Sequence, residues 1–356
     1  MKFRFTATIA ALGLLTPALA GCAETYVSAT PTPVDYKACL VSSDTGFTDG
    51  GLNQMAQYGL LQSEAQYGAG TSSVELKRGA GTAVVASAAR KLVSRGCNLV
   101  LTVGAKSAAA VIPLANGNPQ VRFAVLAASA NTATDGSFTG DNLDLIKFDT
   151  RAAYLQAGYL AAARSVSGKV GIVGLAGDAN AVTDIWYFRQ GVFQYNSASG
   201  KNVAIIGAER AEPETWNLLP KGADNSLVAR MTSEEIAAGA DVLLPAGANG
   251  LVVCQVAALS KALVIGNDSD WTTQPRYSKV ASAVLASVQK PVSAAVVAEV
   301  NRAMGGAAAT KGVPTVIGYT ATLTDEGSVV WGAGISAKLG QLLLDYNAGK
   351  LSVVEQ

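Results

Sequence analysis

The chain has 356 residues, with 27 basic and 26 acidic side chains, so its formal net charge is +1, and it contains no histidine. A charge this close to zero argues against a nucleic-acid-binding surface, and the lack of histidine removes the commonest general base and metal ligand. We therefore expect no nucleic-acid partner, no metal and no cofactor, in a chain long enough for two α/β lobes.

The first residues have the pattern of a lipoprotein leader. Lys2 and Arg4 precede a mostly apolar stretch at residues 5–20, which is too short and too interrupted to span a bilayer comfortably. The stretch closes on the segment LAGC at residues 19–22, which resembles the lipobox of bacterial lipoproteins. We expect residues 1–21 to be a signal peptide and Cys22 to carry the lipid. An ordinary secretory signal followed by a chance cysteine is the alternative.

A linker is expected at residues 22–35, because the segment is small, polar and stiffened by Pro31 and Pro33. With the lipid at its start, it would tether the protein to the extracytoplasmic face of the cell membrane without burying the fold in the bilayer.

Beyond the linker, short apolar runs alternate with helical patterns. The expected strands lie at residues 37–42, 74–77, 99–103, 122–126, 170–174, 203–207, 242–245, 263–266 and 283–287. The expected helices lie at residues 52–67, 82–95, 107–114, 152–165, 184–195, 227–238, 251–260 and 292–304. This alternation predicts parallel sheets with right-handed crossovers.

The alternation pauses at residues 141–149 and restarts at residues 169–174, which favours two similar α/β lobes joined by crossing strands over one long sheet. No G-x-G-x-x-G follows the first strand and no Walker loop is present, so a dinucleotide-binding dehydrogenase and a P-loop NTPase are disfavoured.

Candidate site residues follow the strands, because ligands of open α/β sheets bind beyond the carboxyl ends of the strands. Asp44 and Asp49 follow the first strand and precede a helix. Either could bind a ligand, and the alternatives are an Asx turn for Asp44 and helix capping for Asp49.

The segment NDSDW at residues 267–271 follows another strand, and its carboxylates suit a loop that binds vicinal hydroxyls; a solvated turn is the alternative. Glycines at residues 247 and 250 would let a ligand touch the backbone. Lys290 is either a ligand contact or a surface charge at a helix entry. Trp216 is either a stacking surface or a lid over the core of its lobe.

Six segments stand in order along the chain: DTGFTDGGLNQ at residues 44–54, RFAVL at 122–126, AYLQAG at 153–158, GADVLLPAG at 239–247, VIGNDSD at 264–270 and ASVQK at 286–290. Together they resemble the basic membrane protein (BMP) family, the purine-nucleoside-binding lipoproteins that serve ABC importers. The resemblance extends from about residue 36 to about residue 332.

The resemblance implies a periplasmic-binding-protein type I fold, with two Rossmann-like lobes of parallel sheet joined by a hinge. The first lobe would comprise residues 36–148 plus about 269–318, and the second residues 149–268 plus about 319–356. The implied cargo is a nucleoside, and the implied partners are ABC permease and ATPase subunits. We expect a monomer.

By the same resemblance, Asp44 and Asp268 would hold ribose hydroxyls, Asn53 would bond the ligand, Gly247 would offer its backbone and Lys290 would reach the cleft. Thr45 and Leu52 belong to the same expected site, as does Trp216, which falls where the family often has a phenylalanine on the purine face. The fold also implies a disulfide between Cys39 and Cys97.

Two positions depart from the family pattern. Leu52 stands where the family has an aromatic residue, and Ala127 stands where it usually has an aspartate. A site without that polar partner rejects ligand analogues less strongly. A tethered sensor or scavenger of another small polar solute is therefore an open alternative, whereas a hydrolase is disfavoured because no G-x-S-x-G or S-x-x-K motif accompanies the acids.

Overall fold

The computed structural model describes residues 31–128, 137–210, 212–307, 310–324, 331 and 333–351. The expected leader and Cys22 lie outside these residues. No helix among the described residues is both long and apolar enough to cross a membrane.

The first lobe is built on a six-stranded sheet in which every pair of neighbouring strands is parallel. Its strands, in spatial order, are β2 (Ala69–Val74), β1 (Val34–Val41), β3 (Leu99–Val103), β4 (Arg122–Leu126), β5 (Leu143–Asp149) and β11 (Thr315–Thr320). The structure therefore confirms the parallel α/β architecture.

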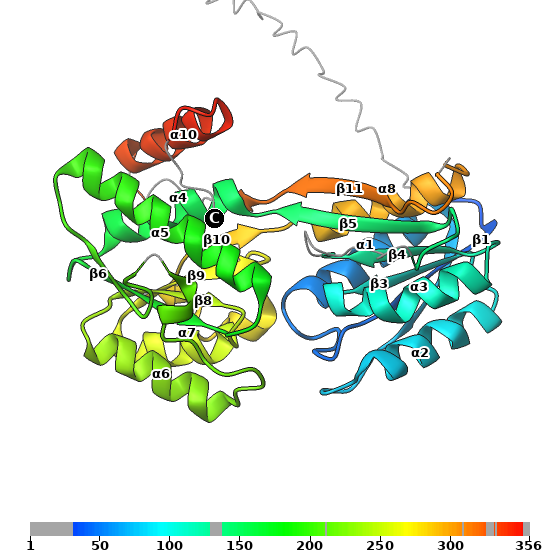
Figure 1. Cartoon of the computed structure of the whole chain (residues 1–356), viewed down its shortest axis with the longest axis horizontal. Coiled ribbons are helices and arrows are strands. Elements are labelled where there is room, and N and C mark those ends of the chain that lie inside the picture. The colour runs from blue at the N-terminus through cyan, green and yellow to red at the C-terminus, as the bar shows by residue number, and fades with distance from the viewer. Residues whose placement is uncertain are drawn as a thin grey trace, which may run out of the picture. The chain divides into compact units, whose positions relative to one another are not determined.

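Helices cover both faces of this sheet (Figure 1). Helices α1 (Leu52–Tyr67) and α8 (Val292–Met304) pack on one face, and α2 (Thr82–Ser94) and α3 (Ala108–Gly117) pack on the other. Strand β1 shows why both faces must be covered: Ala38 and Leu40 face one cluster of buried side chains, while Cys39 and Val41 face the other.

The second lobe repeats the plan around the order β12 (Thr322–Leu323), β10 (Val284–Gln289), β9 (Leu263–Asp268), β8 (Val242–Ala246), β6 (Lys169–Gly174) and β7 (Ala204–Ile206). Only β12 runs antiparallel to its neighbour within this sheet. Its helices are α4 (Arg151–Arg164), α5 (Ala179–Ser199), α6 (Asn225–Ala237), α7 (Gly250–Ser260) and α10 (Ala333–Asn347).

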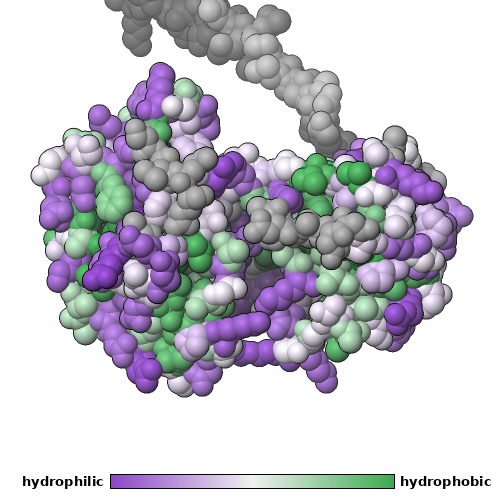
Figure 2. Space-filling model, viewed as in Figure 1, coloured by the Kyte–Doolittle hydropathy of each residue, from purple (hydrophilic) through white to green (hydrophobic). Residues whose placement is uncertain are grey.

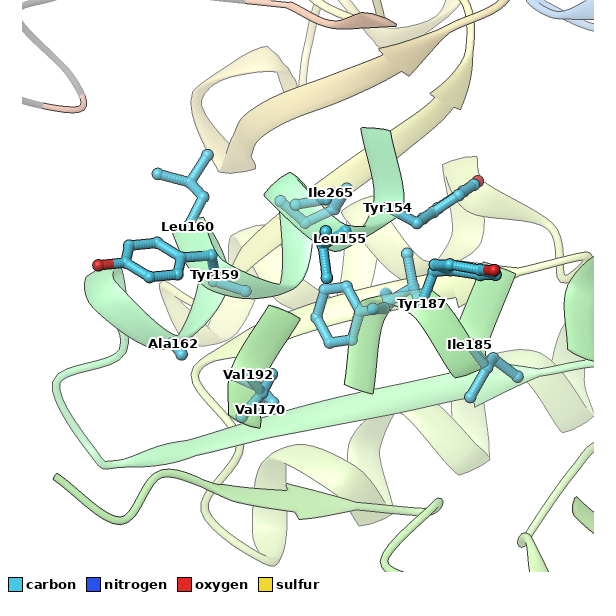
Figure 3. Close-up of a cluster of buried hydrophobic side chains, with 14 of the residues drawn as sticks. Tyr154, Leu155, Tyr159, Leu160, Ala162, Val170, Ile185, Tyr187, Val192 and Ile265 are labelled. Atoms are coloured by element: carbon cyan, nitrogen blue, oxygen red, sulfur yellow. The ribbon is translucent and has the colours of Figure 1, made fainter. Parts of the chain in front are cut away.

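Glycines let α4 and α5 pack very closely. A Cβ added at Gly158 would overlap the carbonyl oxygen of Phe188, and one added at Gly191 would overlap that of Leu155. The two helices form one side of the lobe's core, in which Leu155, Ile185 and Val192 are buried (Figure 3).

A disulfide joins Cys39 on β1 to Cys97 just before β3, as the family resemblance implied. Both residues are buried, and their Cα atoms are 6.0 Å apart. The bond ties two neighbouring strands at the edge of the sheet where β3 begins.

Within the described residues, the chain crosses between the lobes at three places: after β5, after β10 and between β11 and β12. The expected second crossing near residue 269 is corrected, because β10 pairs with β9 in the second sheet and the chain returns only at Lys290. The first lobe also begins earlier than expected, since Val34 and Asp35 belong to β1 and not to the linker.

Some elements differ from the expected ones. The pause at residues 141–149 contains β5, and the expected strand at residues 74–77 lies instead at Ala69–Val74. Strands β11 and β12 and helix α10 were not expected.

Candidate functional site

An ion pair lies at the carboxyl edge of the second sheet. Asp268 ends β9, and Lys290 follows the neighbouring parallel strand β10. The Nζ atom of Lys290 lies 2.6 Å from Oδ1 of Asp268, and the backbone N–H of Lys290 donates to the carbonyl of Asp268. The side chain of Asp268 is 23% exposed, so this ion pair is only partly buried.

The backbone of Asp268 is unusual, because its φ of 66° lies in the left-handed region that few residues other than glycine adopt. The carboxylate faces the first lobe: a Cβ added at Gly51 would lie 3.4 Å from Oδ2 of Asp268. Gly51 precedes α1, so the acid approaches a helix N-terminus, where negative charge is favoured.

A buried carboxyl lies in the same region of the second lobe. Asp184 on α5 is 7% exposed, and its Oδ1 accepts a hydrogen bond of 2.6 Å from Oγ1 of Thr150, the residue between β5 and α4. Tyr154 on α4 also hydrogen-bonds Asp184. In Figure 3, the hydroxyl of Tyr154 points away from the packed side chains of the core.

The charges in this region are coupled. Burial raises the pKa of Asp184 to about 7; Lys290 and Thr150 oppose the rise, while Asp268 and Asp178 add to it. Burial disfavours the charged form of Lys290, but the attraction of Asp268 and Asp184 raises its pKa overall. The region thus combines three carboxyl groups with one ammonium group.

Gly247 lies close to this cluster. It follows β8, and its φ of 74° favours glycine. A Cβ added there would lie 3.3 Å from Oδ2 of Asp178, whose Oδ1 caps the N-terminus of α5. The side chains of Leu175 and Ala181 also lie 3.2 and 3.4 Å from that added Cβ, so Gly247 is closely surrounded on this side.

The loop between β1 and α1 uses its polar groups mostly within itself. Asn53 is 1% exposed; its Oδ1 accepts from the backbone N–H of Ser43, and its Nδ2 donates to Ser43, Thr45 and Asp49. Asp49 accepts from three backbone N–H groups around the start of α1, so it caps that helix.

The remaining expected residues of the first lobe make contacts of their own. Oδ2 of Asp44 accepts from the backbone of Gly79, which ties two loops of the first lobe together. Thr45 is exposed, and Leu52 is half-buried against the core cluster that includes α1 and α8. The structure therefore brings Asp268, Lys290 and Gly247 to one edge, with Gly51 opposite them.

Trp216 is buried in the second lobe. It is 7% exposed, and its Nε1 donates to the carbonyl of Arg210. The guanidinium of Arg189 lies 5.5 Å from the ring centres of Trp216, Trp186 and Phe193. Of the two alternatives for this ring, the observed position corresponds to a cover over the lobe's core.

Sequence reasoning missed Asp184, Tyr154 and Asp178. The helix expected at residues 184–195 begins in fact at Ala179, so Asp184 lies within its first two turns and not at its start. Asp178 could have indicated where this helix begins, because an aspartate one residue before a helix is a common cap.

The two lobes also contact one another directly. Oγ of Ser269 donates to the carbonyl of Gly50, and Nη1 of Arg276 donates to the carbonyl of Thr48 at 3.1 Å. Figure 2 shows hydrophilic side chains in the hollow between the lobes on the face in view. The two lobes therefore contact one another through polar groups along their facing edges.

The chain belongs to the Bmp family, because the model of this family, described as ABC transporter substrate-binding protein, PnrA-like, matches residues 37–318. The chain is thus a substrate-binding protein of an ABC transporter, not an enzyme, and it works outside the cytoplasm. No curated protein sequence matches it significantly.

Solved structures support the fold. An ABC transporter solute-binding protein from Conexibacter woesei has a TM-score of 0.67 at 17% identity, over 90% of this chain and 98% of its own. One from Aeropyrum pernix has a TM-score of 0.66 at 17% identity, over 89% and 87%. A protein from Bacillus halodurans, described as a transcriptional activator of the comK gene, has a TM-score of 0.66 at 18% identity, over 87% and 97%.

Proposed function

We propose that this substrate-binding protein captures a nucleoside, and that a lipid on Cys22 tethers it near its permease. The observation that carries the proposal is the position of the Asp268 carboxylate. Its carboxylate ends β9 at the edge facing the first lobe, and a carboxylate can accept two hydrogen bonds from a vicinal diol such as that of ribose.

Lys290 and Gly247 support the same assignment. Lys290 holds one carboxylate oxygen of Asp268 at 2.6 Å, which orients the other oxygen. Gly247 offers backbone groups at the end of the adjacent strand β8. Asp44, Thr45, Leu52 and Asn53 would contribute from the β1–α1 side, with Asn53 shaping the loop through its internal hydrogen bonds.

Two observations favour a second candidate, another small polyhydroxylated solute. Trp216 turns its indole N–H inward to Arg210, and Ala127 supplies no carboxylate for the polar edge of a base. A ligand without an aromatic base would need neither group. In that case the protein would serve as a receptor or scavenger for a sugar-like solute.

Thermal unfolding with inosine, guanosine, adenosine, uridine and ribose at millimolar concentration tests both candidates. A ligand that binds only the native state at 100 times its Kd stabilises the protein by about 2.7 kcal/mol. We expect the nucleosides to raise the melting temperature and Asp268→Ala to remove that rise. A rise with ribose alone would favour the second candidate, and no rise with any nucleoside would exclude the first.

The matched control is Asp345→Ala, which removes a carboxylate from α10 in the second lobe. This variant should retain the full ligand-induced rise. The anchor is tested separately by Cys22→Ser, which should move the protein from the membrane fraction to the soluble fraction. A membrane-bound Cys22→Ser variant would exclude lipidation at this residue as the anchor.

A further inference from the structure

A short segment of the second lobe reaches the first lobe directly after β9. Oγ of Ser269 donates to the carbonyl of Gly50 at 2.5 Å, and Nη1 of Arg276 donates to the carbonyl of Thr48 at 3.1 Å. Both acceptors are backbone groups in the loop that leads to α1. Residues 269–277, which we call the bridging segment, therefore bond that loop at two points.

Aromatic stacking fixes the bridging segment on its own lobe. The rings of Trp271 and Tyr277 stack with their centres 4.4 Å apart and their planes 8° apart, and both side chains are buried. A Cβ added at Gly250 would overlap the ring of Trp271, so this ring lies directly against the backbone of α7. Nε1 of Trp271 also donates to the carbonyl of Asn267. Because the segment is ordered in advance, its contact with the first lobe costs less entropy to form.

Arg276 lies against a glycine of the other lobe. Its guanidinium is 5.5 Å from the centre of the Tyr277 ring, which holds it on the second lobe. A Cβ added at Gly50 would overlap Cδ of Arg276. Gly50 also has a φ of 67°, in the left-handed region that favours glycine. No larger residue fits at position 50 unless Arg276 is displaced.

The loop that receives these bonds is held by its own hydrogen bonds. Oδ1 of Asp49 accepts from the backbone N–H of Gly51, and the backbone N–H of Gly50 donates to Oε1 of Gln54 at 3.1 Å. The next residue of the loop, Gly51, lies opposite Asp268, whose Oδ2 would be 3.4 Å from an added Cβ. The bridging segment therefore sets the spacing between Asp268 and the start of α1.

We infer that the bridging segment is a latch that keeps the two lobes closed on the cargo, and that Arg276 is its positioning residue, which slows cargo release without touching the cargo. The inference rests on the proposed function only in placing the cargo between the lobes. It does not depend on the cargo being a nucleoside.

The hydrogen bonds of the latch do not involve the cargo. They end on backbone carbonyls of the first lobe, so they form whichever solute is bound, and they must break before the lobes separate at this edge. Arg276 supplies the bond with a charged donor, and such bonds are stronger than those between neutral groups. The rate of opening should therefore depend mainly on Arg276, and the opening of a closed site often limits release.

The first experiment measures opening without cargo. Dyes are attached to Ser87→Cys on α2 and Ala237→Cys on α6, two exposed positions in different lobes, in a Cys22→Ser background. Cys254 is buried and the other two cysteines form the disulfide, so they do not compete for the dyes. Energy transfer between the dyes in single molecules then gives the lifetime of the closed state.

Arg276→Ala should shorten this lifetime by about tenfold, the factor expected for losing a hydrogen bond from a charged group. Arg276→Lys retains a charged donor on a long side chain and should recover most of the lifetime. Lys279→Ala is the matched control, because it removes an exposed cation three residues further along the chain. It should leave the lifetime unchanged.

Gly50→Ala tests the same contact from the first lobe. Its Cβ would displace Arg276 and shorten the closed lifetime. The strain of a left-handed alanine is present in the open and the closed state alike, so it does not by itself change the lifetime. In the Arg276→Ala background, Gly50→Ala should therefore shorten the lifetime no further, whereas two independent effects would multiply.

The second experiment measures the release of inosine by stopped flow. In Arg276→Ala the dissociation rate should rise by the same factor of about ten, while the association rate changes little. A shorter closed lifetime with unchanged inosine release would overturn the role of Arg276 in release. If the lifetime is the same in Arg276→Ala and the wild type, or if the wild type has no closed state, the latch is excluded whatever the cargo. If inosine does not bind, the nucleoside assignment fails and the lifetimes alone decide whether the latch exists.

Discussion

Polar side chains in this protein divide between those that bond within a loop and those that remain accessible at an edge. Asn53 belongs to the first kind, since both ends of its amide are used within the β1–α1 loop. Asp268 belongs to the second, with one oxygen on Lys290 and its side chain partly exposed. Substitutions at the two residues should therefore affect different properties.

Asn53→Ala should lower the free energy of unfolding by about 1–3 kcal/mol, because it leaves the backbone N–H of Ser43 without its acceptor in a part-buried position. Urea denaturation measures the change. Thr45→Ala, at an exposed neighbour in the same loop, should cost less. Loss of ligand binding in Asn53→Ala at unchanged stability would instead make Asn53 a cargo contact.

Glu235 should make the folded protein less stable as the pH rises. It is 3% exposed, its Oε2 has no partner, and burial, with the charges of Glu209 and Glu234, raises its pKa to about 7. Because the pKa is higher in the folded state than in the unfolded state, the folded state binds more protons between about pH 4.5 and pH 7. The contribution of this group to stability therefore falls across that range.

Glu235→Gln removes this titration. The variant should be more stable than the wild type at pH 8 by on the order of 2 kcal/mol, and the difference should shrink toward pH 5. Denaturation at a series of pH values measures both. A difference between the two proteins that does not change with pH would contradict the assignment.

At the scale of elements, periodic apolar runs were enough to predict the central strands and most helices. Strands β3 and β4 lie where they were expected because Leu99–Val103 and Arg122–Leu126 are almost wholly buried and apolar. Strand β5 was missed because Asp144 and Lys147 interrupt its apolar pattern. Asp144 is fully buried and accepts from Arg122, a partner that no local pattern reveals.

Part of the candidate site could also be predicted from the apolar strands. Asp268 and Lys290 follow apolar strands, so the rule that sites lie beyond strand ends found them. Asp184 lies within helix α5. Trp216 packs against Arg189, which belongs to the same helix and lies far from Trp216 in the sequence. Both placements depend on tertiary packing, which a single sequence does not display.

Gly158→Ala should destabilise the protein by about 3 kcal/mol or more, because the added methyl group would overlap the carbonyl of Phe188 and force α4 away from α5. Gly340→Ala on α10 is the control, since no atom lies within 4 Å of its added Cβ, and it should be neutral or slightly stabilising. Thermal unfolding compares the two. Equal melting temperatures would show that the helices can separate at little cost.

The disulfide between Cys39 and Cys97 closes a loop with a sequence separation of 58 residues. Replacing both cysteines by alanine should lower the free energy of unfolding by about 4 kcal/mol, chiefly because the unfolded chain gains freedom. Guanidinium denaturation measures the loss. A double variant as stable as the wild type would mean that the strand pairing alone fixes this edge of the sheet.

At the scale of the whole molecule, hinge crossings and direct contacts jointly link the lobes. The hydrogen bonds from Ser269 to Gly50 and from Arg276 to Thr48 connect the segment after β9 to the loop before α1. These bonds must break if the lobes are to separate at that edge.

Replacing Ser269 and Arg276 together by alanine should shift the protein toward more open conformations. Small-angle X-ray scattering should then give a larger radius of gyration without cargo and a return toward the wild-type value with cargo. Lys279→Ala, at an exposed position nearby, is the control and should leave the scattering unchanged. An unchanged radius in the double variant would mean that the crossings alone set the spacing of the lobes.

The three crossings also determine when each lobe has all of its helices and strands during synthesis. Helix α8 and strand β11 of the first lobe are synthesised after the elements α4 to β10 of the second lobe. Among the described elements, only β12 and α10 of the second lobe follow them. Until Val292–Met304 is available, the face of α1 that packs against α8 has no partner. A fragment ending near residue 150 would thus expose this apolar face, and a chain in transit across a membrane cannot finish its first lobe until nearly the last residues have passed.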